Sequence, residues 1–140
     1  MESEAFSGAK IALVCDTRIV AYRRDDKPSI PWPGLWDLPG GGREGAETPA
    51  ECALREVEEE FGLALAPGRV HWCRRYPGVL DRQRNTYFLA AEIRAAEAAA
   101  IRFGEEGQYW QMMSIEAFLA LPDAISHLQR RLSDYLSGRG

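Results

Sequence analysis

The stretch GREGAETPAECALREVEEEFGL, residues 42–63, decides how this chain folds, and it holds seven glutamates between Glu44 and Glu60. Four of the seven fall within five residues at the end of this run. The stretch continues directly from the glycine turn LPGGG, residues 38–42. Carboxylates crowded in this way repel one another. Either their face is simply solvated, or a positively charged group lies among them.

The same stretch predicts an α-helix over residues 48–62, TPAECALREVEEEFG, with a recognisable start and stop. Thr48 is suited to cap the helix, and Pro49 is suited to the first helical position. Glu51 stands three residues after Thr48 and completes a capping box. Gly62 supplies the C-terminal stop.

At 100° per residue, this helix has one apolar face and one acidic face. The apolar face, which we expect to pack on a sheet, comprises Ala50, Ala53, Leu54, Val57 and Phe61. Three glutamates at spacing i, i+3 and i+4 share another face: Glu56, Glu59 and Glu60. Glu58 points elsewhere and is expected to be solvated.

Three carboxylates on one helical face favour a divalent cation, which would remove their mutual repulsion. Hard oxygen ligands select Mg²⁺ or Mn²⁺, and Mg²⁺ usually takes its remaining ligands from water and phosphates. The arrangement therefore indicates a metal-bridged phosphate substrate. The competing interpretation is an acidic, solvated helix face, because runs of like charge usually are solvated.

The surrounding residues favour the metal site. They fit the pattern G-x5-E-x7-R-E-U-x-E-E-x-G-U, where U is aliphatic, at every defined position: Gly41, Glu47, Arg55, Glu56, Val57, Glu59, Glu60, Gly62 and Leu63. This run from Gly41 to Leu63 resembles the signature of the Nudix hydrolases. Three successive glycines, residues 40–42, let the backbone approach the helix and a ligand closely.

The resemblance implies a single Nudix domain over residues 1–140, an α/β class fold built as an α/β/α sandwich around a central mixed β-sheet. In that fold the signature forms a loop, a helix and a second loop. Enzymes of this family hydrolyse a nucleoside diphosphate linked to another group, with water and Mg²⁺ or Mn²⁺. The implied substrate is a small nucleotide, foremost a nucleoside triphosphate cut to the monophosphate and pyrophosphate, as in MutT-type enzymes.

Other activities stay open. ADP-ribose or another nucleotide sugar is the alternative substrate, because ADP-ribose enzymes often carry a proline some way after the signature, where this chain has Pro77. A dinucleoside polyphosphate or a capped RNA is a further alternative. The alternative of another class is a non-catalytic Nudix domain that binds a nucleotide as a sensor. Such domains usually lose signature carboxylates, and all of them are present here.

By position, the resemblance implies a set of metal ligands: the carboxylates of Glu56, Glu59 and Glu60 and the carbonyl of Gly40. Arg55 and Glu47 resemble the pair that ties the loop to the helix and orients the carboxylates, so Arg55 and Glu59 are counted with the catalytic groups. The charge of Arg55 also offsets part of the acidic repulsion. The alternative for Glu59 is that it only contacts Arg55 at i+4.

The segment EEGQYW, residues 105–110, resembles the EGQ…W segment of MutT-type enzymes, in which the glutamate lies beside the metals. That glutamate corresponds to Glu106. A carboxylate there can accept a proton from the attacking water or orient it. Glu105 is the neighbour that competes for this role, and such loop glutamates are otherwise solvated turn residues.

Three residues are candidates for substrate contacts. Arg23 matches a phosphate-binding arginine of MutT-type enzymes, with a pair to Asp25 or Asp26 as the alternative. Trp32, in the Pro-rich loop of residues 25–34, is expected to form a pocket wall that stacks on a base. MutT-type 8-oxo-dGTP hydrolases read the purine with an asparagine that LALPDAISH lacks; Asp123 is the substitute, and while ionised it accepts but does not donate. The missing asparagine argues against an oxidised guanine nucleotide as the preferred substrate.

Patterns outside the signature predict a sheet flanked by helices. Strands are expected over residues 10–16 and 18–24 as a hairpin, and over 69–79, 85–93 and 108–113. Residues 95–100 are expected to form a turn or short helix, with further helices over 114–121 and 123–136. The last helix has apolar positions at helical spacing: Ile125, Leu128, Leu132, Tyr135 and Leu136. Trp36 and Trp110 are expected to be packing residues.

Composition and net charge bear on the cellular compartment and on the partners of this protein. The chain has 140 residues, 46% of them hydrophobic, and a net charge of −4, so bulk attraction to nucleic acid is not expected. Neither a signal peptide nor a membrane span is recognisable, which favours a cytoplasmic protein with no DNA or membrane partner. Cys15, Cys52 and Cys73 form no CxxC pair, which also fits a reducing compartment. His71 and His127 are expected to be structural or surface residues, and a homodimer is left open.

Overall fold

The computed structural model of the chain describes residues 5–138. Within this range one sheet contains seven strands in the path β3-β2-β1-β6-β5, with β4 paired to β1 and β7 paired to β2. The strands are β1 Phe6–Cys15, β2 Arg18–Arg23, β3 Trp36–Asp37, β4 Gly40–Gly42, β5 Val70–Pro77, β6 Asn85–Glu92 and β7 Tyr109–Ser114. β1 and β6 run parallel and the other pairs run antiparallel. The predicted mixed sheet is therefore confirmed.

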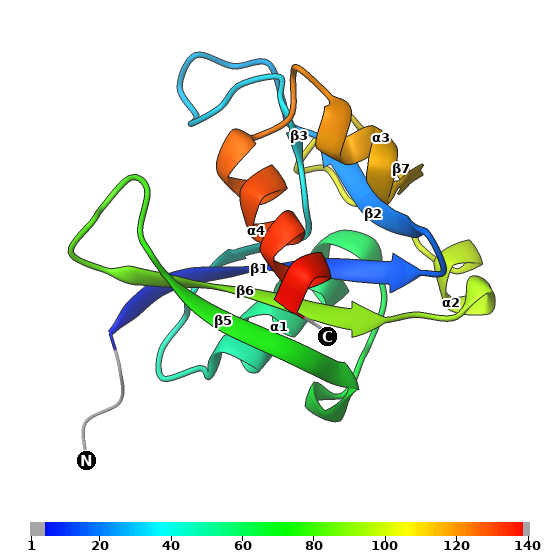
Figure 1. The fold of residues 1–140 in the computed structure, drawn as a ribbon, viewed down its shortest axis with the longest axis horizontal. Coiled ribbons are helices and arrows are strands. Elements are labelled where there is room, and N and C mark those ends of the chain that lie inside the picture. The colour runs from blue at the N-terminus through cyan, green and yellow to red at the C-terminus, as the bar shows by residue number, and fades with distance from the viewer. Residues whose placement is uncertain (1–4, 139–140) are drawn as a thin grey trace.

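Helices cover both faces of this sheet, as Figure 1 shows, with α1 behind it and α4 in front. The helices are α1 Pro49–Phe61, α2 Ala95–Ala99, α3 Ile115–Ala120 and α4 Ser126–Gly138, and a 3₁₀ turn spans Pro67–Arg69. Two separate hydrophobic clusters follow from this arrangement, one under α1 and one under α3 and α4. The expected α/β/α sandwich is confirmed. No helix among residues 5–138 is both long and apolar enough to span a membrane.

The helix α1 begins and ends where its sequence predicts. The Thr48 hydroxyl accepts a hydrogen bond from the Glu51 amide at 3.2 Å, and the Glu51 carboxylate accepts one from the Thr48 amide at 2.8 Å. Gly62 adopts φ 68°, and its amide donates to the Glu58 carbonyl at 3.0 Å. Glycine adopts this left-handed conformation without the steric cost that other residues carry. Both ends of α1 are therefore fixed by local chemistry.

The apolar face of α1 packs on the sheet with one difference from the prediction. Buried residues on this helix are Cys52, Ala53, Leu54, Val57 and Phe61. Ala50 is only half-buried, and the apolar stripe is widened by Cys52, whose small side chain fits against the closely approaching β4. Burying a phenylalanine such as Phe61 contributes about 1.5–3 kcal/mol to stability.

The last helix starts later than predicted. Residues 123–125 bond to β3 instead: the Trp36 amide donates to the Asp123 carbonyl at 2.9 Å, and the Ile125 amide donates to the Trp36 carbonyl at 3.0 Å. This short parallel bridge occupies backbone groups that a helix would need. At the other end, Leu136 was wrongly placed on the apolar face, since it is 36% exposed while Leu132 is buried.

The remaining strands and packing residues agree with the predictions from the sequence. The β1–β2 hairpin turns at Asp16, whose φ is 56°, and β5 and β6 form the second predicted pair. Trp36 is buried as a packing residue, and His71 is structural because its Nε2 lies 2.8 Å from the Tyr135 hydroxyl, which ties β5 to α4. Trp110 is half-buried against the cluster under α1.

Candidate active site

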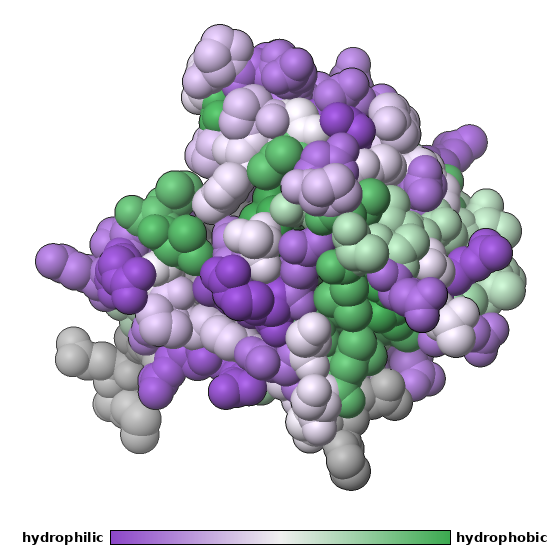
Figure 2. Space-filling view, turned by 45° about the horizontal axis from the view of Figure 1, so that its top comes forward, coloured by the Kyte–Doolittle hydropathy of each residue, from purple (hydrophilic) through white to green (hydrophobic). Residues whose placement is uncertain are grey.

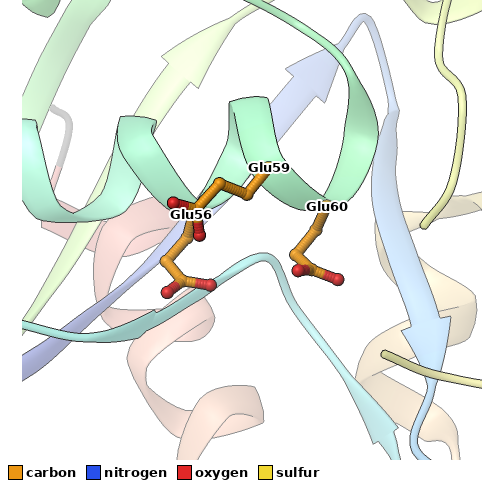
Figure 3. A group of neighbouring side chains, drawn as sticks. All are labelled: Glu56, Glu59 and Glu60. Carbon is orange, nitrogen blue, oxygen red and sulfur yellow. The ribbon is translucent and has the colours of Figure 1, made fainter. Parts of the chain in front are cut away.

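The acidic face of α1 gathers three carboxylates, shown in Figure 3. One oxygen from each of Glu56, Glu59 and Glu60 lies within 4.8 Å of the others. Oxygens that share one Mg²⁺ ion sit about 2.0–2.1 Å from it, so such a cluster can close around a cation with small side-chain movements. The donor set is all oxygen and strongly anionic, which fits Mg²⁺ or Mn²⁺ and disfavours softer metals.

The glycine strand β4 lies directly against this cluster because it has no side chain there. A Cβ atom on Gly41 would lie 2.6 Å from the Glu56 Cδ atom. β4 is fixed in place by antiparallel pairing to β1, with Gly40 opposite Lys10. The Gly40 carbonyl accepts a hydrogen bond from the Lys10 ammonium at 3.4 Å. The backbone expected to supply a metal ligand is therefore next to the carboxylates.

Replacing Gly41 with alanine is expected to lower turnover about 10- to 100-fold, in the range seen when the support of a metal ligand is disturbed. The added methyl group would displace the Glu56 carboxylate rather than the backbone, because the crowded atom ends a flexible side chain. Steady-state rates and thermal melting would test this, with Gly42→Ala as the control. A Cβ on Gly42 meets nothing closer than the Ser7 carbonyl at 3.9 Å. Equal rates for both variants would contradict the prediction.

Arg55 connects the signature loop to the carboxylates. Its Nε donates to Glu47 at 2.6 Å, and a second nitrogen donates to the Gly42 carbonyl at 2.7 Å. Its third nitrogen contacts Glu56 at 3.0 Å and Glu59 at 3.1 Å. The hydrogen bond from Arg55 holds the pKa of Glu47 below its usual value. The predicted pair of Arg55 and Glu47 thus forms, and the i+4 contact to Glu59 forms beside it.

A loop glutamate completes the cluster. The Gly104 amide donates to the Glu60 carbonyl at 2.7 Å, which anchors the loop before β7 at the end of α1. Glu106, in this loop, lies close enough to Glu60 for the two carboxyl groups to share a hydrogen-bonded proton. Burial, the charge of Glu106 and this hydrogen bond together raise the pKa of Glu60 to about 7. Burial also raises the pKa of Glu56. The cluster therefore resists carrying its full negative charge without a cation.

Cation binding is expected to weaken on acidification, because the proton on Glu60 must leave before a metal binds. Since burial and Glu106 raise the pKa of Glu60 to about 7, the group is protonated below that pH and ionised above it. The dissociation constant for Mn²⁺ should rise about tenfold per pH unit below neutrality and level off about one unit above it. Calorimetric titration of Mn²⁺ across this range measures the effect. A constant affinity on both sides of neutrality would contradict it.

A cavity of about 360 Å³ adjoins the cluster through β4. Gly41 and Lys10 line this cavity, and so do Trp32 and His127, whose ring centroids lie 5.1 Å apart. Burial lowers the pKa of His127 to about 4, so this imidazole is neutral at physiological pH. Trp32 is thus brought to a pocket wall as expected. His127 was expected only as a structural or surface residue, and no spacing in the sequence marks it as a pocket residue.

Arg23 and Asp123 are brought together, but not in this cavity. An Arg23 nitrogen lies 3.3 Å from an Asp123 oxygen, and neither residue is among those that line the cavity beside Trp32. The expected alternative partner of Arg23, Asp25 or Asp26, is therefore wrong, and Asp25 pairs with Lys27 instead. The Arg23 partner is 100 residues away in the chain, so no local pattern could identify it.

The structure also contains a buried charge network that the sequence did not predict. Asp37 is fully buried and accepts hydrogen bonds from Arg24 at 2.8 Å, Tyr22 at 2.9 Å and Lys10 at 3.0 Å. Burial alone would raise the pKa of Asp37, but Lys10 and Arg24 hold it below its usual value. Arg24 also donates to the Pro31 carbonyl at 2.9 Å. The network therefore ties the Pro-rich loop that carries Trp32 to the glycine strand.

Comparisons with known proteins agree with this geometry. A model of the NUDIX domain matches residues 7–136. An RNA pyrophosphohydrolase of Gluconacetobacter diazotrophicus is 44% identical over 52 residues, 35% of this chain and 31% of that protein. An 8-oxo-dGTP diphosphatase of Proteus vulgaris is 50% identical over 30 residues, 21% of this chain and 27% of that protein. These alignments span less than a third of either relative.

The fold has close counterparts among solved structures. A MutT protein from Methanosarcina mazei Go1 superposes with a TM-score of 0.74 at 17% identity, and 99% of each chain is covered. At this identity the likeness concerns the fold alone. The match to the NUDIX domain model extends over most of the chain. The chain belongs to the Nudix family.

Proposed function

We propose that this protein is a Mg²⁺- or Mn²⁺-dependent pyrophosphohydrolase that cleaves a nucleoside triphosphate to the monophosphate and pyrophosphate. The observation that carries the proposal is the meeting of three carboxylates within 4.8 Å beside a glycine strand that also lines a cavity. The carboxylates supply a cation site, and the cavity supplies room for a nucleoside. All the signature carboxylates are present, which opposes a purely nucleotide-binding sensor domain.

In this proposal the metal is held by the carboxylates of Glu56, Glu59 and Glu60 and by the carbonyl of Gly40. Metal ions bound there would withdraw charge from the diphosphate and lower the pKa of a coordinated water. Arg55 positions Glu56 and Glu59 through its hydrogen bonds and keeps the loop fixed through Glu47. The chain therefore contributes mainly orientation and negative charge.

Glu106 is the proposed base. Its carboxylate lies at Glu60, where it can accept the proton as water attacks phosphorus. The new P–O bond forms to the water oxygen while the bridging P–O bond to pyrophosphate breaks, and pyrophosphate leaves with the bonding electron pair. The proton stays on the carboxylate until solvent removes it. The contact with Glu60 supports Glu106 over Glu105.

The nucleoside is proposed to lie in the 360 Å³ cavity with its base against Trp32. Base–aromatic stacking contributes about 1–3 kcal/mol and tolerates different bases. A phosphate clamp by Arg23 and a base contact by Asp123 both require their ion pair to open toward the substrate. The relatives named RNA pyrophosphohydrolase and 8-oxo-dGTP diphosphatase support a substrate that carries a pyrophosphate group.

A substrate panel tests this function. Purified protein would be incubated with Mg²⁺ or Mn²⁺ and with canonical and oxidised nucleoside triphosphates, ADP-ribose and dinucleoside polyphosphates, and the products separated by chromatography. Monophosphate plus pyrophosphate from a triphosphate is the expected result. AMP plus ribose phosphate from ADP-ribose would redirect the proposal to nucleotide sugars. Inactivity on the whole panel would overturn it in favour of a binding domain.

The proposed setting is a reducing compartment such as the cytoplasm. Support comes from three cysteines that are free, among them Cys73, which is exposed. The proposed partner is the small nucleotide itself. Fractionation with an antibody to the protein would test the compartment, and sedimentation would decide between monomer and homodimer.

A further inference from the structure

A second cavity, of about 700 Å³, adjoins the first. It lies between the β5–β6 turn and α4, and four residues line both cavities: Gly78, Val79, His127 and Arg131. Figure 2 shows the surface hollowed beside the apolar group over the β5–β6 turn. That turn exposes Leu80, 72% accessible, and Val79, 43% accessible. The two cavities are therefore parts of one continuous depression that leads away from the carboxylates.

The lining of the second cavity is basic, although the chain has a net charge of −4. Three arginines line it: Arg82, Arg130 and Arg131. Within residues 5–138, Arg82 and Arg130 form no ion pair or side-chain hydrogen bond. The single carboxylate in the lining, Asp134, already accepts from the Tyr76 hydroxyl at 2.9 Å and lies 3.7 Å from Arg74. Free positive charge therefore remains in this cavity.

Arg131 is the most unusual of these residues because its side chain is buried and, within residues 5–138, forms no ion pair or hydrogen bond with a carboxylate. The residue is only 7% exposed. Its nitrogens donate to the Thr86 hydroxyl and the Pro77 carbonyl, both at 3.1 Å, and its guanidinium lies 4.5 Å from the Tyr76 ring centroid. Burial lowers its pKa below the usual value. All three of these contacts are with neutral groups, and the charge of Asp134 offsets only part of the effect of burial.

A buried cation whose hydrogen-bond partners are all neutral is costly for folding, and an anionic ligand lowers that cost. Arg131 lines both cavities, so it marks the point where they meet. Arg82 and Arg130 continue the positive charge outward from that point. Guanidinium groups in such an arrangement suit phosphate, which they bind through paired hydrogen bonds.

The order of the sites along the depression indicates how a bound nucleotide would be oriented. The carboxylates come first, the cavity lined by Trp32 comes next, and the basic cavity comes last. A nucleotide whose 5′-diphosphate lies at the carboxylates and whose nucleoside fills the first cavity would direct its far side toward the basic cavity. Besides the base, the 3′-oxygen of the ribose is a group that lies away from the 5′-diphosphate, and a 3′-phosphate or 3′-phosphodiester is attached there.

We propose that the basic cavity binds a second phosphate, one attached to the 3′ side of the nucleotide, through Arg82, Arg130 and Arg131. The inference deepens the function proposed above and rests on it for the placement of the 5′-diphosphate. Its volume of about 700 Å³ exceeds the needs of one phosphate group, which favours a short 5′-triphosphorylated oligonucleotide. A mononucleotide with a 3′-phosphate has the same chemistry.

The test compares three substrates: a nucleoside 5′-triphosphate, the same nucleotide with a 3′-phosphate, and the 5′-triphosphorylated dinucleotide. We expect kcat/KM to be about 10- to 100-fold higher for a substrate with the second phosphate, as for a charged hydrogen bond gained. In the Arg82→Gln/Arg130→Gln variant this preference should fall to about twofold, while the rate with the simple triphosphate is unchanged. Both arginines are exposed, so the fold is expected to tolerate the change. Arg18→Gln removes an equal charge from an exposed site that lines neither cavity.

The outcomes separate the two proposals. A preference for the dinucleotide alone supports an oligonucleotide substrate, and a preference for both phosphorylated forms supports recognition of the phosphate itself. No preference in the wild type, or one that survives in the double variant, overturns the inference. If no substrate turns over, the proposed function fails. Calorimetry in EDTA then tests separately whether the basic cavity binds a phosphate. The wild type should then bind adenosine 3′,5′-bisphosphate about tenfold more tightly than AMP. The double variant should bind the two ligands with equal affinity.

Discussion

Replacing Glu60 with glutamine is expected to remove nearly all turnover and to leave the fold intact. The amide keeps the shape of the side chain but lacks the negative charge that a hard cation requires. We expect kcat to fall about 10²- to 10⁴-fold, the range for loss of one charged group in a catalytic constellation. Burial and Glu106 raise the pKa of Glu60 to about 7, so its charge is unfavourable in the metal-free protein. The variant should therefore melt no lower than the wild type in EDTA above neutral pH.

Glu58→Gln is the matched control for this variant. Glu58 belongs to the same helix and the same run of acidic residues, but it is exposed and lies outside the carboxylate cluster. Steady-state rates with Mg²⁺ and circular dichroism melts of both variants would give the comparison. If Glu60→Gln kept the wild-type rate, the assignment of the metal site would be lost.

The acidic helix could be predicted from sequence because its determinants are local. The capping box joins residues three apart, and the carboxylates of Glu56, Glu59 and Glu60 share a face through helical periodicity alone. The sheet on which the helix packs follows from strand patterns of the same kind. The resemblance to the Nudix signature then added the role of Gly40 and the pair of Arg55 with Glu47, of which the pair is present.

The substrate side could not be predicted because its contacts join distant parts of the chain. The position of Arg23 suggests a phosphate clamp, yet its partner Asp123 belongs to the segment that bonds to β3. That backbone bridge also delayed the start of the last helix. The ring pair of Trp32 and His127 depends on how the Pro-rich loop folds over α4. No periodicity in either segment encodes such a contact.

The buried charge network around Asp37 is a second feature that could not be predicted from the sequence. In the sequence, Lys10 is the first residue of a predicted strand, and no local pattern links it to Asp37. Only the pairing of β1 with β4 and of β2 with β3 brings them within 3.0 Å of each other. A buried carboxylate must be paired with opposite charge to remain ionised. The sheet topology therefore had to be known before these partners could be assigned.

Glu106 and Glu105 are neighbours in the chain, and their glutamine variants are expected to differ sharply. Burial is the largest cause of the raised pKa of Glu60, and of the two neighbours it is Glu106 that adds to it, through its charge and a hydrogen bond. As the proposed base, Glu106 should lose about 10²- to 10⁴-fold in kcat on conversion to glutamine, with little change in KM. Glu105 is exposed and has no such contact, so Glu105→Gln should stay within about twofold of the wild type.

A pH profile separates this role from a purely structural one. Removing the Glu106 charge takes away one cause of the raised pKa of Glu60, so that pKa should fall toward its usual value of 4.5. Mn²⁺ binding in Glu106→Gln should then persist to lower pH than in the wild type, even though turnover is lost. Loss of binding together with turnover would instead make Glu106 a metal ligand. A large loss of turnover in Glu105→Gln alone would transfer the base to Glu105, because the loop would then bring that neighbour to the reacting water.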